Sequence, residues 1–307
     1  MRQVSVVIPC YNQERFLGEA IESALGQEGC GPVEVVVVDD GSADATAEVA
    51  TRYIGVKYIR QANAGLAAAR NRGLAESGGE YVVFLDADDR LLPEALRVGV
   101  AALDARPDLA FVSGHYSLID ADGSLISAPP PSRCPEDDHY FALLQRNYIG
   151  MNATVMYRRS ILEFAGGFAV SRRACEDYDL YLRIARRFLI SCHHTVIAEY
   201  RQHGGNMSKD CNLMMKSSIS VLRAQWTSVR GDKRLKHAYR AGITWWRDYY
   251  AKGLINQAKS DFKSRNLKRL TNDLLTLLQY HPRGFFAKGG LGLIRKVVHG
   301  LKLTRNP

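Results

Sequence analysis

Residues 33–46 read VEVVVVDDGSADAT, and this stretch decides the fold class of the sequence around it. The apolar, β-branched run from Val33 to Val38 predicts a strand buried on both faces, because half-exposed strands alternate apolar and polar residues. Two carboxylates, Asp39 and Asp40, follow it directly. A fully buried strand is typical of a parallel sheet covered by helices, so strands and helices should alternate on either side.

The flanking sequence alternates in this way as far as residue 113. Apolar runs predict further strands over residues 4–8, 56–60, 81–85 and 109–113. Helices are expected from Phe16 to Leu25 with Asn12 as N-cap, from Ser42 to about Tyr53, over 66–77, and after Pro93. The sequence therefore predicts an α/β fold with a mostly parallel sheet, in which ligands bind beyond the carboxyl ends of the strands.

The second half of the chain is less regular. A Pro-rich loop is expected over residues 128–135, and a turn at Gly166-Gly167. Helices are predicted over 138–146 and 177–188, and strands over 153–157 and 190–200. Beyond about Asp210 the pattern is helical, with breaks at Gly231, Pro282 and Gly289-Gly290. We expect a catalytic domain over 1–208 and a basic, mainly helical region over 209–307.

Charge is divided unevenly along the chain. Residues 205–307 hold 21 Lys and Arg against five Asp and no Glu, whereas residues 1–204 hold 20 basic and 27 acidic residues. This asymmetry suggests two roles: the acidic part can hold a cation, and the basic part can face an anionic surface. No apolar run approaches the roughly 20 residues of a membrane-spanning helix, so a cytoplasmic location is the expectation.

Carboxylates gather after two of the predicted strands. Asp39-Asp40 follow one strand, and Asp86-Ala87-Asp88-Asp89 follow another. Each Asp alone would be explained as a turn or helix cap. Two clusters at equivalent strand ends instead indicate a site for a divalent cation, Mg²⁺ or Mn²⁺, because neighbouring carboxylates repel one another unless a cation lies between them.

Five motifs in order carry a resemblance to a known family. They are VSVVIPCYNQ (4–13), VVVVDDGSADAT (35–46), NAGLAAARNRGL (63–74), YVVFLDADD (81–89), and GGF (166–168) followed by CEDYDLYLRIA (175–185). From about residue 4 to 208, the chain resembles the family 2 glycosyltransferases of the GT-A fold. The resemblance implies an inverting enzyme that moves a sugar from a nucleoside-diphosphate donor, most often UDP but also GDP or dTDP, to an acceptor hydroxyl.

The resemblance also implies roles for particular residues. The residues expected to bind the donor are Pro9, Tyr11, Asn12, Asp39, Asn63, Arg70, Asp86 and Glu176. Asp88, within the DxD motif, and His203, within YRQH (200–203), are expected to bind the divalent cation. The family pattern places the general base at Asp177. A base is needed because an acceptor hydroxyl must lose its proton as it attacks. The alternative for Glu176-Asp177 is that two acids merely charge a helix N-terminus.

Six cysteines are present, and none forms a CxxC pair. The spacing is not that of a zinc module or a small disulfide scaffold. In Cys192-His193-His194, adjacent residues on a strand should point to opposite faces, so no structural zinc site is expected there and both histidines are interpreted as structural.

The basic C-terminal region holds three tryptophans, and residues 291–303 (LGLIRKVVHGLKL) mix apolar and basic groups. Such a helix can lie on an anionic membrane, which would suit a glycan or lipid-linked acceptor and peripheral attachment to the inner face of the plasma membrane. A solvated basic face or an oligomer contact explains it equally well. No nucleic-acid-binding signature accompanies the basic residues, so nucleic acid is not an expected partner.

Two other functions are compatible with parts of the sequence. A sugar nucleotidyltransferase should carry a Gly-rich, basic loop after the first strand, but PCYNQERFL stands there. A non-catalytic nucleotide-sugar-binding or scaffold protein could keep the fold without turnover, although the intact Asp86, Asp88 and Asp177 speak against it.

Overall fold

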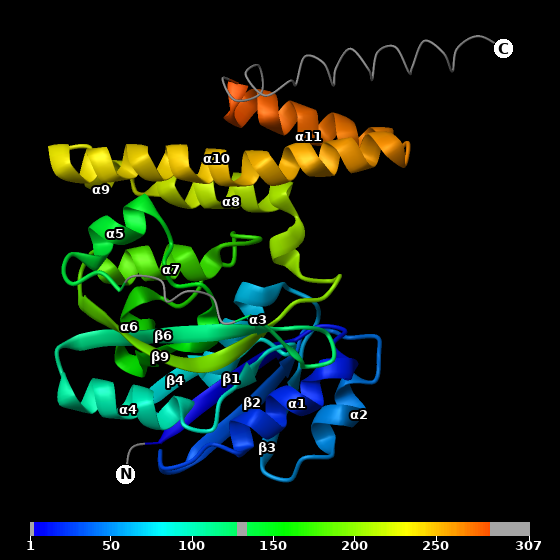
Figure 1. Ribbon diagram of the computed structural model, residues 1–307. Helices are drawn as coiled ribbons and strands as arrows, with labels where there is room; N and C mark the ends of the chain where they lie inside the picture. Colours follow the sequence, from blue (N-terminus) through cyan, green and yellow to red (C-terminus); the bar gives the residue numbers. More distant parts are fainter. Residues whose placement is uncertain (1–2, 128–133, 283–307) are drawn as a thin grey trace. The chain divides into compact units, whose positions relative to one another are not determined.

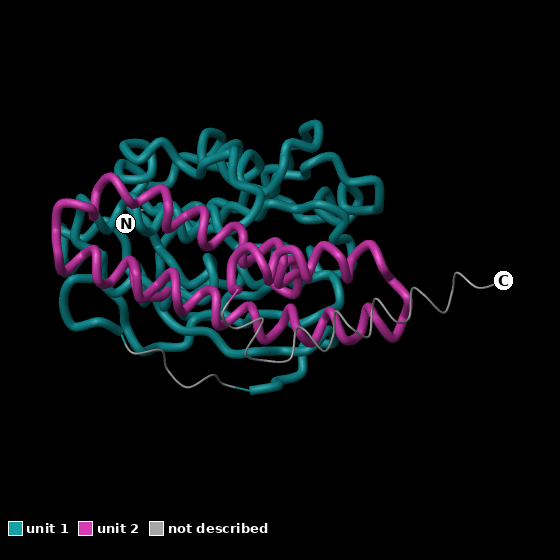
Figure 2. The backbone as a smooth tube through the Cα atoms, turned by 90° about the horizontal axis from the view of Figure 1, so that it is seen from above, with its two compact units in different colours: residues 1–143, 147–206 teal, residues 144–146, 207–307 magenta. Residues whose placement is uncertain are grey.

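The computed structural model describes residues 3–127 and 134–282. The chain forms two compact units, coloured separately in Figure 2. The first unit comprises residues 1–143 and 147–206, and the second comprises residues 144–146 together with the chain from 207 onward. The second unit thus resumes at Met207.

The first unit is built on one sheet, which has nine strands within the described ranges (Figure 1). The strands are β1 Val4–Cys10, β2 Val33–Asp39, β3 Val56–Arg60, β4 Tyr81–Phe84, β5 Arg90–Leu91, β6 Leu109–Ile119, β7 Leu125–Ser127, β8 Val155–Arg158 and β9 Leu189–Arg201. Their order is β3-β2-β1-β4-β8-β6-β9-β5, with β7 paired to β6. β3, β2, β1 and β4 run parallel, as do β6 and β9, whereas β8 is antiparallel to both of its neighbours.

The helices of this unit cover both faces of the sheet. They are α1 Glu14–Leu25, α2 Thr46–Thr51, α3 Leu66–Glu76, α4 Ala95–Ala105, α5 His139–Gln145, whose last two residues belong to the second unit, α6 Arg159–Ala165 and α7 Glu176–Ala185, with a short 3-10 helix at Asn152–Thr154. The predicted α/β fold with a mostly parallel sheet and flanking helices is confirmed. The expected helix from Ser42 to about Tyr53 is wrong in extent, since α2 begins only at Thr46.

The alternation of side chains along β2 explains why two helix layers form. Val35 and Val37 pack with the apolar face of α1, whereas Val36 and Val38 pack with Ala69 of α3. α3 lies close against the sheet at Gly73, where an added Cβ would be 2.2 Å from Val7 Cγ1. This close approach sets the position of α3, and with it the position of the functional side chains on that helix.

The second unit is helical within the described residues. It contains a 3-10 helix at Met207–Lys209, α8 Cys211–Ala224, α9 Trp226–Val229, α10 Lys233–Lys263 and α11 Leu267–Tyr280. The polar residues before three of these helices act as caps: Asp210, Asp232 and Asn266 accept backbone hydrogen bonds from the first turns of α8, α10 and α11. The predicted break at Gly231 lies between α9 and α10, and a break at 264–266 was not predicted.

Some expectations fall outside the described residues. The Gly289-Gly290 break and the stretch 291–303 are among them. Of the helices that the structure does describe, none is long and apolar enough to span a bilayer.

Candidate active site

Three neighbouring parallel strands bring the predicted donor residues to one edge of the sheet. β2, β1 and β4 lie side by side, with Cys10 of β1 opposite Asp39 of β2. The segment Asp86–Asp89 follows the end of β4. The carboxyl ends of parallel strands meet at one edge, so the topology places both carboxylate clusters there.

The loop after β1 is tied to the loop after β2 through Asn12. The Asn12 backbone N–H donates to Ser42 Oγ at 2.9 Å, and Asn12 Oδ1 accepts from the Ala43 N–H at 2.8 Å. The side chain of Asn12 is therefore committed to this link, and the expected capping of α1 by Asn12 is wrong, because Gln13 is the N-cap residue. Pro9 is buried within β1, whereas Tyr11 is 51% exposed and could stack on a planar group such as a base.

The first carboxylate cluster is held by protein donors. Asp39 Oδ1 accepts from the Ser42 N–H at 2.7 Å, and Asp39 Oδ2 accepts from the Tyr58 hydroxyl at 2.7 Å. Burial by itself would raise the pKa of Asp39, but these hydrogen bonds outweigh it and leave the pKa lowered. Both oxygens of this buried carboxylate thus already have a protein partner.

Asp40 fixes the loop that contains Asn63. Its carboxylate accepts hydrogen bonds from Gln61 Nε2 and from the Ala64 and Gly65 N–H groups, each at 2.8 Å. The loop holds Asn63 exposed at the same edge of the sheet. Asp40 was grouped with the cation-binding carboxylates in sequence, and its role here is to shape the loop in front of α3.

Arg70 of α3 connects two parts of the predicted site. Its guanidinium donates to Asp86 Oδ1 and to Glu176 Oε1, both at 2.6 Å, and lies over the Phe168 ring at 5.3 Å. Burial alone would lower the pKa of Arg70, but the charges of Asp86 and Glu176 outweigh burial and raise it, so the side chain stays charged. The structure thus brings Arg70, Asp86 and Glu176 together as an ion-pair network, in which Arg70 and Glu176 are buried and Asp86 is partly exposed.

The predicted base lies at the start of α7. Cys175 precedes the helix in the left-handed region, with φ of 59°, and Asp177 is partly exposed next to the buried Glu176. Burial, followed by the charge of Glu176, raises the pKa of Asp177 to about 7, although Arg70 opposes the shift. A carboxylate with this pKa can accept a proton near neutral pH.

Asp88 and His203 meet although they are distant in sequence. His203 Nε2 lies 2.8 Å from Asp88 Oδ2, and His203 Nδ1 accepts from the Gly205 N–H at 3.2 Å. A neutral imidazole that accepts at Nδ1 carries its proton at Nε2, so the ring donates to Asp88. Burial, followed by the neighbouring Asp86 charge, raises the pKa of Asp88. In the tautomer that leaves the lone pair on Nε2, this nitrogen and Asp88 Oδ2 converge beside the repelling Asp86 carboxylate and fit a divalent cation.

Sequence reasoning missed the part played by Arg201. Its side chain is fully buried, lies over the Phe16 ring at 4.9 Å, and donates from Nε to the Asp88 carbonyl oxygen at 2.8 Å. The Arg201 N–H donates to Asp89 Oδ1 at 2.8 Å. Arg201 therefore fixes the backbone of the DxD segment against β9. Arg201 lies in the YRQH segment (200–203), from which the sequence analysis assigned a role only to His203.

One pair of cysteines is bonded, which sequence spacing did not predict. Cys134 and Cys192 are joined as a disulfide, with their Cα atoms 5.8 Å apart, while Cys10, Cys30, Cys175 and Cys211 are free thiols. The fold does not depend on a disulfide framework, because the sheet and its helices enclose an apolar core.

The fold is that of the GT-A glycosyltransferases, with a mostly parallel sheet that carries two carboxylate clusters at one edge. The chain belongs to glycosyl transferase family 2, whose family model matches residues 5–165, more than half of the sequence.

Known proteins and structures are similar to this chain. An uncharacterized glycosyltransferase of Rickettsia felis is 30% identical over 233 residues, which cover 71% of this chain and 38% of that protein. TarS of S. aureus in complex with UDP-GlcNAc has a TM-score of 0.66 at 19% identity, covering 92% of this chain and 82% of that one. The mannosyltransferase PcManGT of Pyrobaculum calidifontis, in complex with GDP-Man and Mn²⁺, has a TM-score of 0.62 at 19% identity, covering 99% and 80%.

The curated relatives are longer than the region that this chain matches. The chain spans between 38% and 64% of the length of the Rickettsia, Bacillus and Haemophilus relatives that it matches. At below 25% identity, the structural neighbours establish the GT-A fold. The roles of individual site residues are predictions from the sequence and from the geometry described above.

Proposed function

We propose that this protein is an inverting, metal-dependent glycosyltransferase that moves a sugar from a nucleoside-diphosphate sugar to an acceptor hydroxyl. The observation that carries the proposal is the Arg70 bridge, which joins Asp86 after β4 to Glu176 at the start of α7. Through this bridge the candidate base Asp177 lies beside the donor edge of the sheet. Proton acceptor and donor site are then adjacent, as transfer requires.

In the proposed reaction, Asp177 takes the proton of the acceptor hydroxyl as its oxygen bonds to the anomeric carbon. The bond from that carbon to the diphosphate oxygen breaks, and a single displacement of this kind inverts the anomeric centre. A pKa of about 7 suits the task, because the carboxylate is then both ionised and basic enough near neutral pH. Arg70 holds Asp86 and Glu176 in place and keeps the acidic cluster from repelling itself apart.

Asp88 and His203 would hold the divalent cation, Mn²⁺ or Mg²⁺. The cation would neutralise the charge of the leaving diphosphate. Arg201 supports this pair by fixing the backbone of the DxD segment. The Mn²⁺ named with GDP-Man in the PcManGT complex supports a cation in this fold.

The nucleoside end of the donor is proposed to lie against the loops after β1 and β2. Tyr11 offers an exposed ring for stacking, and Pro9, Asn12, Asp39 and Asn63 form the surrounding edge. UDP is the preferred nucleotide, supported by the UDP-GlcNAc named with TarS. GDP is the competing nucleotide, supported by the GDP-Man named with PcManGT.

A glycan or lipid-linked molecule is the proposed acceptor, with the basic second unit binding an anionic membrane surface. α10 exposes Lys233, Arg234 and Arg240, and the same unit exposes Trp226 at 40% and Tyr249 at 56%. Basic and aromatic side chains together favour the membrane interface. Co-sedimentation with phosphatidylglycerol vesicles should exceed that with phosphatidylcholine vesicles and should fall with salt. Equal recovery after charge reversal of Lys233, Arg234 and Arg240 would exclude this surface.

Donor binding gives the first test of the function. Thermal unfolding is measured with UDP, GDP, dTDP and CMP, with and without Mn²⁺. One diphosphate should raise the midpoint in a metal-dependent way, since saturation at 100 times Kd stabilises the native state by about 2.7 kcal/mol. The matching sugar nucleotides are then assayed for diphosphate release. Absence of any shift or release with Mn²⁺ present would favour a non-catalytic protein.

A further inference from the structure

Two histidines and two cysteines gather where β6 pairs with β9 in the first unit. His115 belongs to β6, Cys192 and His194 belong to β9, and Cys134 precedes α5. The ligand atoms of His115, Cys134 and His194 all lie within 4.8 Å of one another, and Cys134 is bonded to Cys192. Nothing in the proposed transfer reaction uses these side chains.

Strand geometry explains how they meet. Cys192 and His194 are two residues apart, so the alternation of a strand puts them on one face while His193 points to the other. β9 is also irregular here: Ser113 pairs with Cys192 and His115 with Val196, so one residue of β6 lies opposite three of β9. The extra residues let His194 approach His115. The sequence expectation compared only adjacent residues on a single strand and did not consider residues that tertiary structure brings to it from β6 and from the segment before α5.

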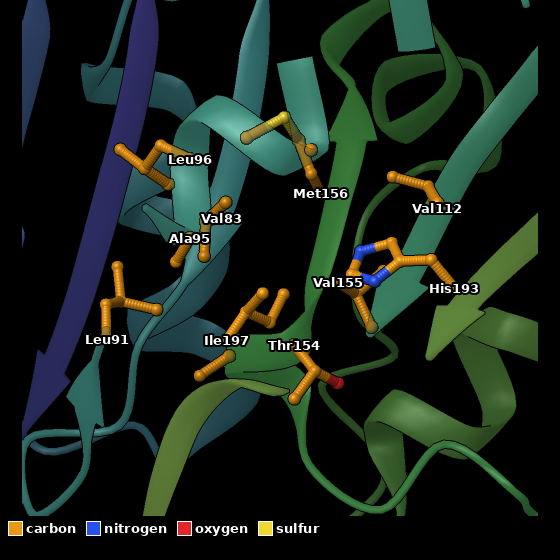
Figure 3. A pocket seen from close by; sticks show the side chains of 12 residues that line it. Val83, Leu91, Ala95, Leu96, Val112, Thr154, Val155, Met156, His193 and Ile197 are labelled. Carbon is orange, nitrogen blue, oxygen red and sulfur yellow. The ribbon is translucent and has the colours of Figure 1, made fainter. Parts of the chain in front are cut away.

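His193 confirms the division of faces. Its ring lines a small apolar cavity of about 10 Å³ together with Val112, Thr154 and Ile197 (Figure 3). His193 Nε2 is buried and has no hydrogen-bond partner among the described residues. This cavity has room for about one water molecule and belongs to the core. Of the two consecutive histidines, only His194 joins the cysteines.

The distance between the two imidazole nitrogens matches that of a tetrahedral metal site. His115 Nε2 and His194 Nδ1 are 3.4 Å apart. Zinc–nitrogen bonds of about 2.0–2.1 Å in a tetrahedron put two nitrogens about 3.3–3.4 Å apart. A disulfide needs only the two sulfurs, and it does not explain why two imidazoles converge beside it. Two Cys and two His form a donor set that selects zinc.

We propose that His115, Cys134, Cys192 and His194 bind one Zn²⁺ when the two cysteines are reduced. His115 is buried, Cys134 is half-buried and His194 is exposed, which leaves a path for the ion to enter. The bound ion would link β6, β9 and the segment leading into α5. Its role is structural, because all four positions of the tetrahedron are taken by protein.

Reduction of the disulfide must precede zinc binding, because only thiolate sulfur binds the ion. Two molecules of a small thiol reduce the Cys134–Cys192 bond, giving two protein thiols and one small-molecule disulfide. Zn²⁺ then displaces one proton from each thiol and binds the two thiolates and the two neutral imidazoles. Oxidation reverses these steps and releases the ion, so zinc and the disulfide exclude each other.

The test uses the full chain, reduced with a phosphine and freed of metal, then titrated with Co²⁺ and Zn²⁺. Co²⁺ should give the intense visible bands of a tetrahedral site and a thiolate-to-cobalt charge-transfer band, and Zn²⁺ should abolish both at about one ion per chain. Cys134→Ser and His194→Ala should each remove or strongly weaken the signal. The matched controls, Cys211→Ser and His193→Ala, should keep it, as should Asp88→Ala.

Reduced wild-type protein that is folded by circular dichroism and gives no thiolate band would overturn the proposal, whatever the variants do. So would an undiminished band in Cys134→Ser. Cations held at the carboxylate edge give no thiolate band. The site is therefore judged separately from the proposed transferase function, and failure of one leaves the other standing.

Discussion

Asp39 and Asp40 follow β2, and Asp86, Asp88 and Asp89 follow β4, so two carboxylate clusters share one edge of the sheet. In the first cluster, the protein itself supplies five hydrogen-bond donors at 2.7–2.8 Å. In the second, burial and the mutual repulsion of the carboxylates raise the pKa of Asp88 and of Asp89. The hydrogen bonds instead leave the pKa of Asp39 lowered.

Protein donors thus favour the ionised form of Asp39, whereas burial and carboxylate repulsion oppose the ionised forms of Asp88 and Asp89. A carboxylate satisfied by backbone N–H groups stabilises the fold at neutral pH, because its ionised form is the one that is bound. Carboxylates that raise one another's pKa destabilise the ion-free protein, and a cation relieves that cost. Asp177 resembles Asp88 and Asp89 in this respect, because burial and the Glu176 charge raise its pKa to about 7.

The largest effect is expected at the candidate base. Asp177→Asn removes the proton acceptor while keeping the shape of the side chain, so transfer should fall by about 10²–10⁴-fold. Metal-dependent binding of the donor nucleotide should be retained. Steady-state kinetics and nucleotide titration check the two parts, with the exposed Asp122→Asn as the control. Near-normal turnover would remove Asp177 from the mechanism.

Asp88→Asn should abolish the metal-dependent part of nucleotide binding, with transfer reduced by orders of magnitude. The same change removes a repelling charge, so the ion-free protein should be as stable as the wild type or slightly more so. Calorimetry with and without Mn²⁺ measures both quantities. Donor affinity that responds to Mn²⁺ as in the wild type would contradict the assignment of Asp88.

The pH dependence of transfer should report the raised pKa of Asp177. Below about pH 7 the carboxyl is protonated and cannot accept the hydroxyl proton, so kcat/KM should rise about tenfold per pH unit and level off above pH 7. Glu176→Gln removes a charge that raises this pKa, and the midpoint should move to lower pH. A midpoint that stays unchanged in that variant would disconnect Glu176 from the base.

The smallest effect on activity and the clearest effect on stability are expected at Asp40. Asp40→Asn turns an amide toward the Ala64 and Gly65 N–H groups that Asp40 now binds, and the free energy of unfolding should fall by about 1–3 kcal/mol. Urea unfolding of this variant beside Asp88→Asn tests the comparison directly. Equal stability of the two variants would mean that the clusters do not differ as described.

Local pattern carried much of the fold. β3 was predicted to the residue, and β1, β2 and β4 within two residues, because buried parallel strands are short, continuous apolar runs. Helix starts were less accurate: Asn12 and Ser42 looked like caps, yet each hydrogen-bonds across to the other's loop. A capping side chain is recognised only by its partner, and here the partner lies about thirty residues away.

The sequence by itself determined the α/β class, the order of its elements and the edge of the sheet where chemistry belongs, since hydrophobic periodicity is a property of neighbouring residues. Only the tertiary structure decided which carboxylates have their pKa lowered by hydrogen bonds and which have it raised by burial and repulsion. Arg70 meets Glu176 across 106 residues, and Asp88 meets His203 across 115. The same holds for His115, Cys134 and His194, which come together through an irregular strand pairing that no local pattern encodes.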